Sequence, residues 1–132
     1  MELTKAGEYG VFGVIYLAKQ PKDKVVSLSE VSKAEGIPEK FLAKIFQSLS
    51  RGGFIRSHRG AHGGFSLARP AEKITLRELI ECAQGPIYLL NCLRDIDLCV
   101  RKGDCPVRKV WSKAQDSLVE ILDQHTLADL AS

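Results

Sequence analysis

Apolar residues recur at helical spacing in the first part of the chain. From Leu3 to about Lys19 they fall on most turns without an intervening proline, which predicts a helix with a broad buried face. Ser27 and Glu30 have the spacing of a capping box, in which each side chain bonds the backbone N–H of the other residue, so a short helix is predicted over residues 28–35. Gly36 is placed to end that helix.

A third helix is predicted after Pro38, because the apolar residues of the next segment share one helical face. That face consists of Phe41, Leu42, Ile45, Phe46 and Leu49. The period of the pattern then falls to two, and residues 54–60 and 63–69 are predicted to form strands joined by a glycine-rich turn. Three helices followed by a two-stranded hairpin is the order of a winged helix-turn-helix, so we expect a mainly α fold with a small β-hairpin.

Two more helices are predicted in the second half of the chain. Thr75 and Glu78 repeat the capping-box spacing at the start of one, and Gly85 ends it. Asp104 and Pro106 open a long helix with an apolar seam at alternating spacings of four and three, formed by Val107, Trp111, Ala114, Leu118 and Ile121. Such a seam is typical of a helix packed along a partner helix. We therefore expect a homodimer. Because the seam covers only about two heptads, a neighbouring helix of the same chain is the alternative.

Composition and charge indicate one globular domain with an anionic partner. The chain has 132 residues, of which 45% are hydrophobic, and is long enough to bury a core. No apolar run near the N-terminus suits a signal peptide or a membrane span, so a cytoplasmic protein without membrane contact is expected. The net charge is +3, but residues 40–71 contain six Lys or Arg residues and no Asp or Glu, which indicates an anionic partner at this segment.

Double-stranded DNA is the expected partner, although a solvated basic face that binds nothing is the alternative. In a winged helix-turn-helix the third helix enters the major groove, and the hairpin lies along the backbone or the minor groove. Lys40, Lys44 and Gln47 lie on successive turns of the third helix, while Arg59 and His62 flank the glycine-rich turn. The candidate DNA-binding residues are Lys5, Ser29, Glu39, Lys40, Lys44, Gln47, Arg51, Arg59 and His62.

Three cysteines, Cys92, Cys99 and Cys105, are separated by six and then five residues. In a reducing compartment such a cluster is more often a metal or redox site than a set of disulfides. Soft thiolates suit iron–sulfur clusters, whereas structural zinc sites favour closer pairs, so we favour an iron–sulfur cluster over zinc. A metal-free thiol switch is the other alternative, because Cys105 precedes Pro106 at a predicted helix N-terminus, where thiols are more reactive.

An enzyme is not expected from the remaining residues. His58, His62 and His125 are far apart in the chain, and neither a phosphate-binding glycine motif nor a pair of carboxylates is present. A small iron–sulfur electron carrier is the competing class, but electron transfer does not need a basic hairpin. Cys82 lies on the apolar face of a predicted helix and is expected to be a core residue.

The stretches LTKAGEYGV, IPEKFLAKIFQSLSRGGFI, RGAHGGFSLARP and CPVRKVW follow one another between Leu3 and about Leu130. Together they resemble the IscR- and NsrR-type regulators of the Rrf-two family of bacterial winged-helix transcription factors. The resemblance implies a homodimeric repressor or dual regulator that senses iron–sulfur or iron status, redox state or nitric oxide. Its operator binding would be controlled by a cluster on Cys92, Cys99 and Cys105. A 2Fe–2S cluster is favoured, and a 4Fe–4S cluster is also compatible.

The resemblance also implies a division of the chain. A winged helix-turn-helix DNA-binding domain spans residues 1–85, a cluster-binding loop spans 86–106, and a dimerisation helix and tail span 107–132. The sequence departs from the family pattern at Arg108, where IscR-like proteins place a histidine ligand, because a guanidinium stays protonated and cannot ligate. Some relatives take a carboxylate ligand across the dimer, so we expect the fourth ligand to be Glu8, donated by the partner subunit. The alternatives are a Glu8 that is only solvated at the surface, with Asp97, Asp104, a small exogenous thiol or water as the ligand.

Two further departures concern the loop and the third helix. IscR-like proteins have five residues in both cysteine intervals, whereas the first interval of this chain has six, so its loop is expected to bulge by one residue. Ala43 stands where these proteins often carry a Glu that helps to discriminate among operators, which leaves the target preference open.

Overall fold

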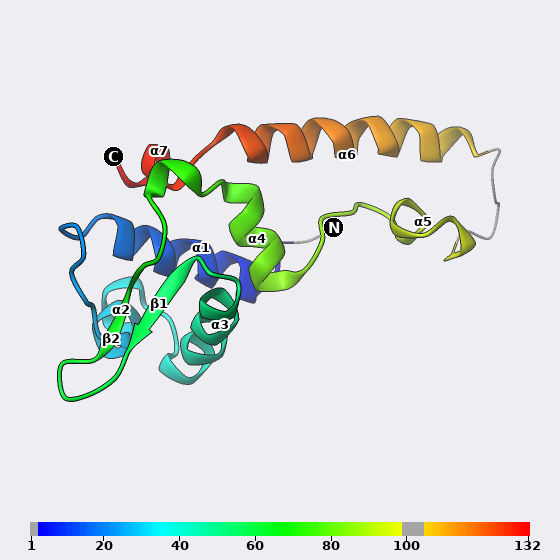
Figure 1. Cartoon of the computed structure of the whole chain (residues 1–132). Helices are drawn as coiled ribbons and strands as arrows, with labels where there is room; N and C mark the ends of the chain where they lie inside the picture. Colours follow the sequence, from blue (N-terminus) through cyan, green and yellow to red (C-terminus); the bar gives the residue numbers. More distant parts are fainter. Residues whose placement is uncertain (1–2, 99–104) are drawn as a thin grey trace.

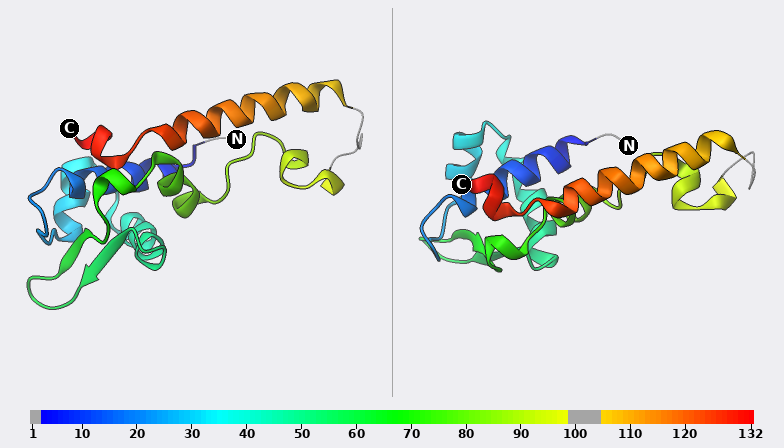
Figure 2. Two further views of the ribbon diagram at one scale, coloured as in Figure 1. Left: turned by 45° about the horizontal axis from the view of Figure 1, so that its top comes forward. Right: turned by 90° about the horizontal axis from the view of Figure 1, so that it is seen from above.

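The computed structural model describes residues 3–98 and 105–132 (Figure 1). A body of helices and a two-stranded hairpin occupies one end of the molecule, and one long helix crosses it and extends beyond it (Figures 1 and 2). The elements are α1 (Lys5–Ala18), α2 (Leu28–Glu35), α3 (Glu39–Arg51), β1 (Ile55–His58), β2 (Gly64–Leu67), the 3₁₀ turn η1 (Ala71–Lys73), α4 (Leu76–Gln84), α5 (Asn91–Arg94), the 3₁₀ turn η2 (Ile96–Leu98), α6 (Pro106–Gln124) and α7 (Leu127–Ala131). The expected mainly helical fold with one hairpin is confirmed.

The helices of the body begin and end where local chemistry predicts. Ser27 caps α2 by accepting a hydrogen bond from the backbone N–H of Glu30 at 3.1 Å, and Gly36 ends α2 with a φ of 66°. The capping box also predicted a bond from the backbone N–H of Ser27 to the Glu30 side chain, and this was wrong. The Glu30 carboxylate instead accepts a hydrogen bond of 2.6 Å from the Tyr16 hydroxyl. This bond to a carboxylate raises the pKa of the Tyr16 phenol. Glu30 therefore ties α2 to α1.

The apolar face of α3 forms the centre of the core. Leu42, Ile45, Phe46 and Leu49 are buried, as their spacing predicts. Phe41, which was expected on the same face, is not buried with them, because 42% of it is exposed. Its ring meets the edge of the Tyr9 ring at a centroid distance of 5.6 Å, at the margin of the body. The two ends of the apolar face therefore have different roles.

The hairpin is antiparallel, pairs Ile55 with Leu67 at its base, and is attached to the body by main-chain bonds. The N–H of Val26 donates to the carbonyl oxygen of Phe65 at 2.8 Å, and the reverse bond is 2.7 Å. The Phe65 ring also packs edge-on against Phe46, with 4.9 Å between centroids. A Cβ atom at Gly64 would overlap the carbonyl oxygen of Val26, so this close approach requires glycine. Strand β2 is thereby fixed to the segment just before α2.

The helix α4 starts with a complete capping box, since Thr75 and Glu78 bond each other's backbone N–H groups. It packs along α1, where a Cβ atom at Gly10 would come within 3.1 Å of the Ala83 side chain. The carbonyl oxygen of Ile74, just before α4, accepts a hydrogen bond of 2.7 Å from the N–H of Leu127. Leu127 is fully buried in the core, so α7 anchors the C-terminal end of α6 to the body.

The long helix α6 begins at Pro106 with Cys105 as its N-cap residue, while Asp104 lies outside the described residues. None of the α6 side chains that the structure describes is buried. Four large apolar residues of this helix are strongly exposed, namely Val107 (55%), Val110 (66%), Trp111 (43%) and Ile121 (55%). Val107, Trp111 and Ile121 of the apolar seam thus remain largely uncovered by the described part of the chain. None of the described helices is long and apolar enough to cross a membrane.

Candidate DNA interface and candidate sulfur site

The surface of α3 opposite the core carries a row of polar and basic side chains. Lys40, Lys44, Gln47 and Arg51 follow one another at helical spacing, and all four are exposed. Glu39 is exposed at the first position of the same helix. Because α3 is held by its buried face, this row is presented on a rigid element. The expected third-helix residues therefore lie on one face.

The start of α1 extends this surface, because Lys5 lies beside the aromatic pair at the margin of α3. The ammonium nitrogen of Lys5 is 5.6 Å from the centroid of the Tyr9 ring, and Tyr9 in turn contacts Phe41. Neither Tyr9 nor Phe41 was predicted at this surface, since neither residue departs from the apolar pattern of its helix. Ser29 is half-exposed in the first turn of α2, close in sequence to the Val26 attachment of the hairpin.

The turn of the hairpin presents Arg59 and His62, which are both exposed. A hydrogen bond of 3.0 Å from the N–H of Gly63 to the carbonyl oxygen of Gly60 closes this turn. His58 is not available in the same way, because its Nε2 lies 2.8 Å from the hydroxyl of Ser66. The tip of the hairpin therefore offers one arginine and one histidine to a partner.

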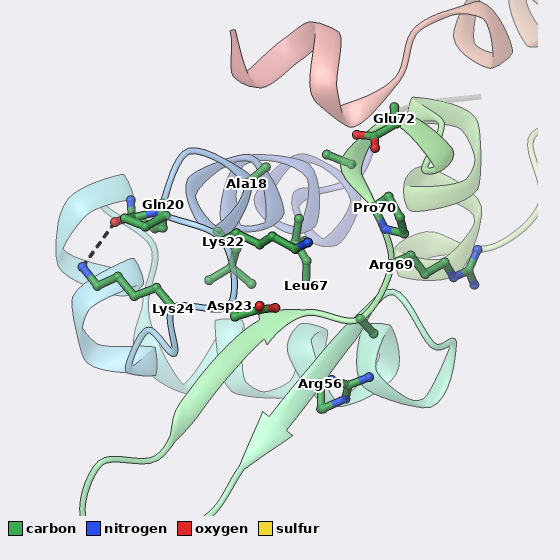
Figure 3. Close-up of a pocket in the computed structure, with 14 residues that line it drawn as sticks. Ala18, Gln20, Lys22, Asp23, Lys24, Arg56, Leu67, Arg69, Pro70 and Glu72 are labelled. Carbon is green, nitrogen blue, oxygen red and sulfur yellow. Dashed lines mark hydrogen bonds between the residues drawn. The ribbon is translucent and has the colours of Figure 1, made fainter.

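One of the six basic residues of this segment has a structural role. Arg69 donates hydrogen bonds of 3.1 Å to the carbonyl oxygens of Gly52 and Gly53, and its guanidinium lies 4.2 Å above the Phe54 ring. It therefore binds the end of α3 and does not belong to the exposed basic row. Figure 3 shows its guanidinium directed away from a cavity of about 490 Å³ between the end of α1 and the segment after β2.

That cavity carries charges of both signs, from Lys22, Asp23 and Glu72, over an apolar floor that includes Leu67 (Figure 3). Neither a cysteine nor a residue of α3 lines it. It is therefore separate both from the exposed row on α3 and from the cysteines.

The cysteines lie at the other end of the molecule, where α5 runs beside the first part of α6 (Figure 1). Cys92 is in α5 and Cys105 caps α6, and both are half-buried free thiols. Cys99 lies outside the described residues. Among the described residues no group of three or more His, Cys, Asp or Glu side chains could hold a metal ion. A complete ligand set within the described chain is therefore not formed.

Arg108 connects the two described cysteines. It lies in the first turn of α6, three residues after Cys105, and its Nη2 donates to the carbonyl oxygen of Cys92 over 3.4 Å. Its Nε is buried and has no hydrogen-bond partner within residues 3–98 and 105–132. An unpaired buried donor of this kind costs about 1–3 kcal/mol. This orphaned cationic donor fits a site that holds anionic sulfur.

Two other candidate residues lie elsewhere in the protomer. Glu8 is in α1 and forms an ion pair of 3.4 Å with Lys5, and the single chain does not bring it together with the cysteines (Figure 1). Cys82 packs against the hydrophobic core with its Sγ 3.5 Å from the carbonyl oxygen of Ser48, as expected. Burial raises the pKa of the Cys82 thiol.

The helix order, the attached hairpin and the basic row define a winged-helix DNA-binding protein. The chain belongs to the Rrf2 (Rrf-two) family of transcriptional regulators, because the family model described as an iron-dependent transcriptional regulator matches residues 3–132. This confirms the family resemblance found in the sequence.

Three solved structures are similar to the chain over nearly all of its length. CymR (YrzC), the global cysteine regulator of B. subtilis, is 30% identical with a TM-score of 0.84, over 99% of this chain and 96% of that chain. CymR of Staphylococcus aureus is 28% identical with a TM-score of 0.81, over 98% and 97%. IscR of T. potens is 31% identical with a TM-score of 0.79, over 98% and 85%.

Single substitutions in the exposed row and at the hairpin tip should weaken DNA binding. Lys40→Ala, Lys44→Ala and Arg59→Ala each remove a cation from the expected interface. Loss of a phosphate contact should flatten the slope of log affinity against log salt by about one unit, whereas loss of a base contact should cost about 1–3 kcal/mol at one position. Fluorescence anisotropy with a duplex selected from a random pool by the wild-type protein measures both effects.

Lys73→Ala is the matched control, because Lys73 is exposed in η1 and outside the basic row. Its affinity and salt slope should equal those of the wild type. Wild-type binding by all three interface variants would contradict the assignment of this surface.

Proposed function

We propose that this protein is a repressor or dual regulator of transcription whose operator binding is controlled by a sulfur site at Cys92, Cys99 and Cys105. The observation that carries the proposal is the position of the two described cysteines, in α5 and at the start of α6, with the cationic Arg108 connecting them. The preferred occupant is an iron–sulfur cluster, with 2Fe–2S favoured and 4Fe–4S compatible. The family description and the similarity to IscR support it.

The three cysteine thiolates would hold the cluster, and such a cluster supplies a group whose oxidation state and occupancy change with iron and oxidants. The protein's own part is to convert the shape of this loop into a position of α6. Gln115 on α6 accepts a hydrogen bond of 2.8 Å from the N–H of Leu89, and α7 holds the far end of α6 to the body. A change at Cys105 therefore acts at the end of α6 that is remote from the core.

A homodimer completes this proposal, because the exposed apolar residues of α6 suit a second copy of the same helix. In such a dimer the position of α6 sets the spacing of two α3 helices on a two-fold operator. The proposed site of action is the cytoplasm, where bacterial DNA lies. In the proposed dimer Glu8 of one protomer would serve the cysteines of the other, because the single chain does not bring Glu8 together with its own cysteines.

A cluster-free thiol switch on the same fold is the second candidate. The similarity to the global cysteine regulator CymR favours it, as does an oxidized form of the S. aureus protein among the similar structures, at 26% identity and a TM-score of 0.82. In this case oxidation of Cys92, Cys99 or Cys105 takes the place of cluster loss. An electron carrier is disfavoured by membership in a family of transcriptional regulators.

Replacement of each proposed ligand should remove the cluster without unfolding the protein. Cys92→Ala, Cys99→Ala and Cys105→Ala should lose iron, acid-labile sulfide and visible absorption after anaerobic purification, because the core is formed by other elements. Cys82→Ala is the matched control and should keep the spectrum. DNA binding by holo and apo protein is measured in parallel. A colourless, iron-free wild type with reversible thiol oxidation would support the switch instead, and equal iron loss from Cys82→Ala would contradict the ligand assignment.

Trp111→Ser should weaken the dimer, because this side chain is 43% exposed in the protomer and would be covered by the partner. Burial of a large apolar side chain contributes about 1.5–3 kcal/mol, so the dimer dissociation constant should rise about tenfold or more. Sedimentation equilibrium measures this change. Lys113→Ser on the same helix is the control and should keep the wild-type constant. A monomeric wild type would contradict the proposed seam.

Glu8→Ala and Glu8→Cys should both change the iron–ligand bands in resonance Raman spectra, because Glu8 of the partner subunit is the proposed fourth ligand. Oxygen is a harder ligand than thiolate, so Glu8→Cys should also lengthen the lifetime of the cluster. Lys5→Ala is the matched control, since it breaks the Lys5–Glu8 ion pair and keeps the carboxylate. Wild-type bands and lifetime in Glu8→Ala would exclude this ligand.

A further inference from the structure

Arg108 differs from Arg69, which also joins two segments of this protein. Arg69 has two carbonyl acceptors at 3.1 Å and an aromatic ring beneath its guanidinium. Arg108 has one long hydrogen bond of 3.4 Å to Cys92, and its buried Nε has no acceptor in the described part of the chain. Arg108 therefore links α5 to the start of α6, and its Nε donor has no acceptor among the described residues.

No described carboxylate neutralises this cation. The ion pairs among residues 3–98 and 105–132 are those of Lys5 with Glu8 and of Arg77 with Glu81 and Asp123. A guanidinium stays charged at any physiological pH, so Arg108 is a fixed positive charge with a free donor. The anion that suits it is the sulfur carried by the neighbouring cysteines, either as thiolate or as part of a cluster.

We propose that Arg108 is a positioning residue of the sulfur site, which fixes the α5 backbone against the start of α6 and sets the reduction potential of the sulfur group by its charge. This inference rests on the proposed function of the cysteines. Reduction adds negative charge to the site, and a nearby fixed cation favours the more negative form. Arg108 therefore raises the reduction potential, although it binds no metal itself.

Arg108 should raise the reduction potential for both proposed occupants, the iron–sulfur cluster and the disulfide. Reduction of a cluster transfers one electron from a titrant such as dithionite to iron. Reduction of a disulfide formed by Cys92 or Cys105 uses two glutathione thiols and breaks the S–S bond, which gives oxidised glutathione, one protein thiol and one protein thiolate whose proton passes to the solvent. In both couples the cation stabilises the reduced, anionic sulfur form. Removal of the charge should therefore lower the potential in either case.

Arg108→Gln and Arg108→Lys separate charge from shape. Gln keeps an amide donor without the charge, and Lys keeps the charge without the planar fork. We expect Arg108→Gln to reduce the equilibrium constant for reduction about tenfold, which is about 59 mV for a one-electron couple and about 30 mV for a two-electron couple. Arg108→Lys keeps the charge, so it should lower the reduction potential by less than half as much as Arg108→Gln does. Anaerobic redox titration of the purified protein measures the potential, and circular dichroism checks folding.

Arg94→Gln is the matched control, because Arg94 lies in α5 two residues from Cys92 and its guanidinium rests 5.4 Å from the Tyr88 ring centroid. Its potential should equal that of the wild type. An unchanged potential in Arg108→Gln, or an equal shift in Arg94→Gln, would overturn the role of Arg108 alone. A wild-type protein with neither a cluster nor a reversible disulfide would overturn the proposed function as well.

Discussion

Close packing of α1 against α3 and α4 is the constraint on which both candidate sites depend. A Cβ atom at Gly13 would come within 2.8 Å of the Phe46 ring, and one at Gly10 within 3.1 Å of the Ala83 side chain. Glycine at these positions lets the helices approach, which holds α3 with its polar row outward and fixes α4 where the cysteine segment leaves the body. The same contact brings Lys5 and Tyr9 beside α3. One helix thus positions a basic surface and the base of the sulfur site.

The two sites lie at opposite ends of the protomer and share few direct contacts (Figures 1 and 2). Their coupling must therefore pass through an element with two discrete positions. The helix α6 suits this role, because its C-terminal end is tied to the core by Leu127 while its N-terminal turn carries Cys105 and Arg108. Four of its large apolar side chains are exposed in the protomer, so in the proposed dimer a movement of α6 would change the spacing of the two α3 helices.

Charge is used in three different ways along this chain. The Lys and Arg side chains of the α3 row and the hairpin tip remain exposed, where their attraction to DNA is long-ranged and depends on salt. Arg69 donates hydrogen bonds to backbone carbonyls and packs on an aromatic ring, so it stabilises the fold. Arg108 has a buried donor without an acceptor in the described residues, and it is the cation proposed to act on the sulfur site. Formal charge alone does not distinguish these roles.

The sequence by itself determined the features that arise within a few residues. Helix starts at Ser27 and Thr75, the end of α2 at Gly36 and the hairpin all follow from local backbone chemistry, and their positions were predicted. The helix order and the basic segment likewise indicated a winged-helix DNA-binding protein. The tertiary structure alone decided which of several partners a side chain takes. Glu30 bonds Tyr16 instead of its own helix, Phe41 meets Tyr9 at the margin, and Arg69 binds the end of α3. Arg108 reaches a carbonyl sixteen residues away. These choices depend on segments distant in sequence, whose approach no local pattern records.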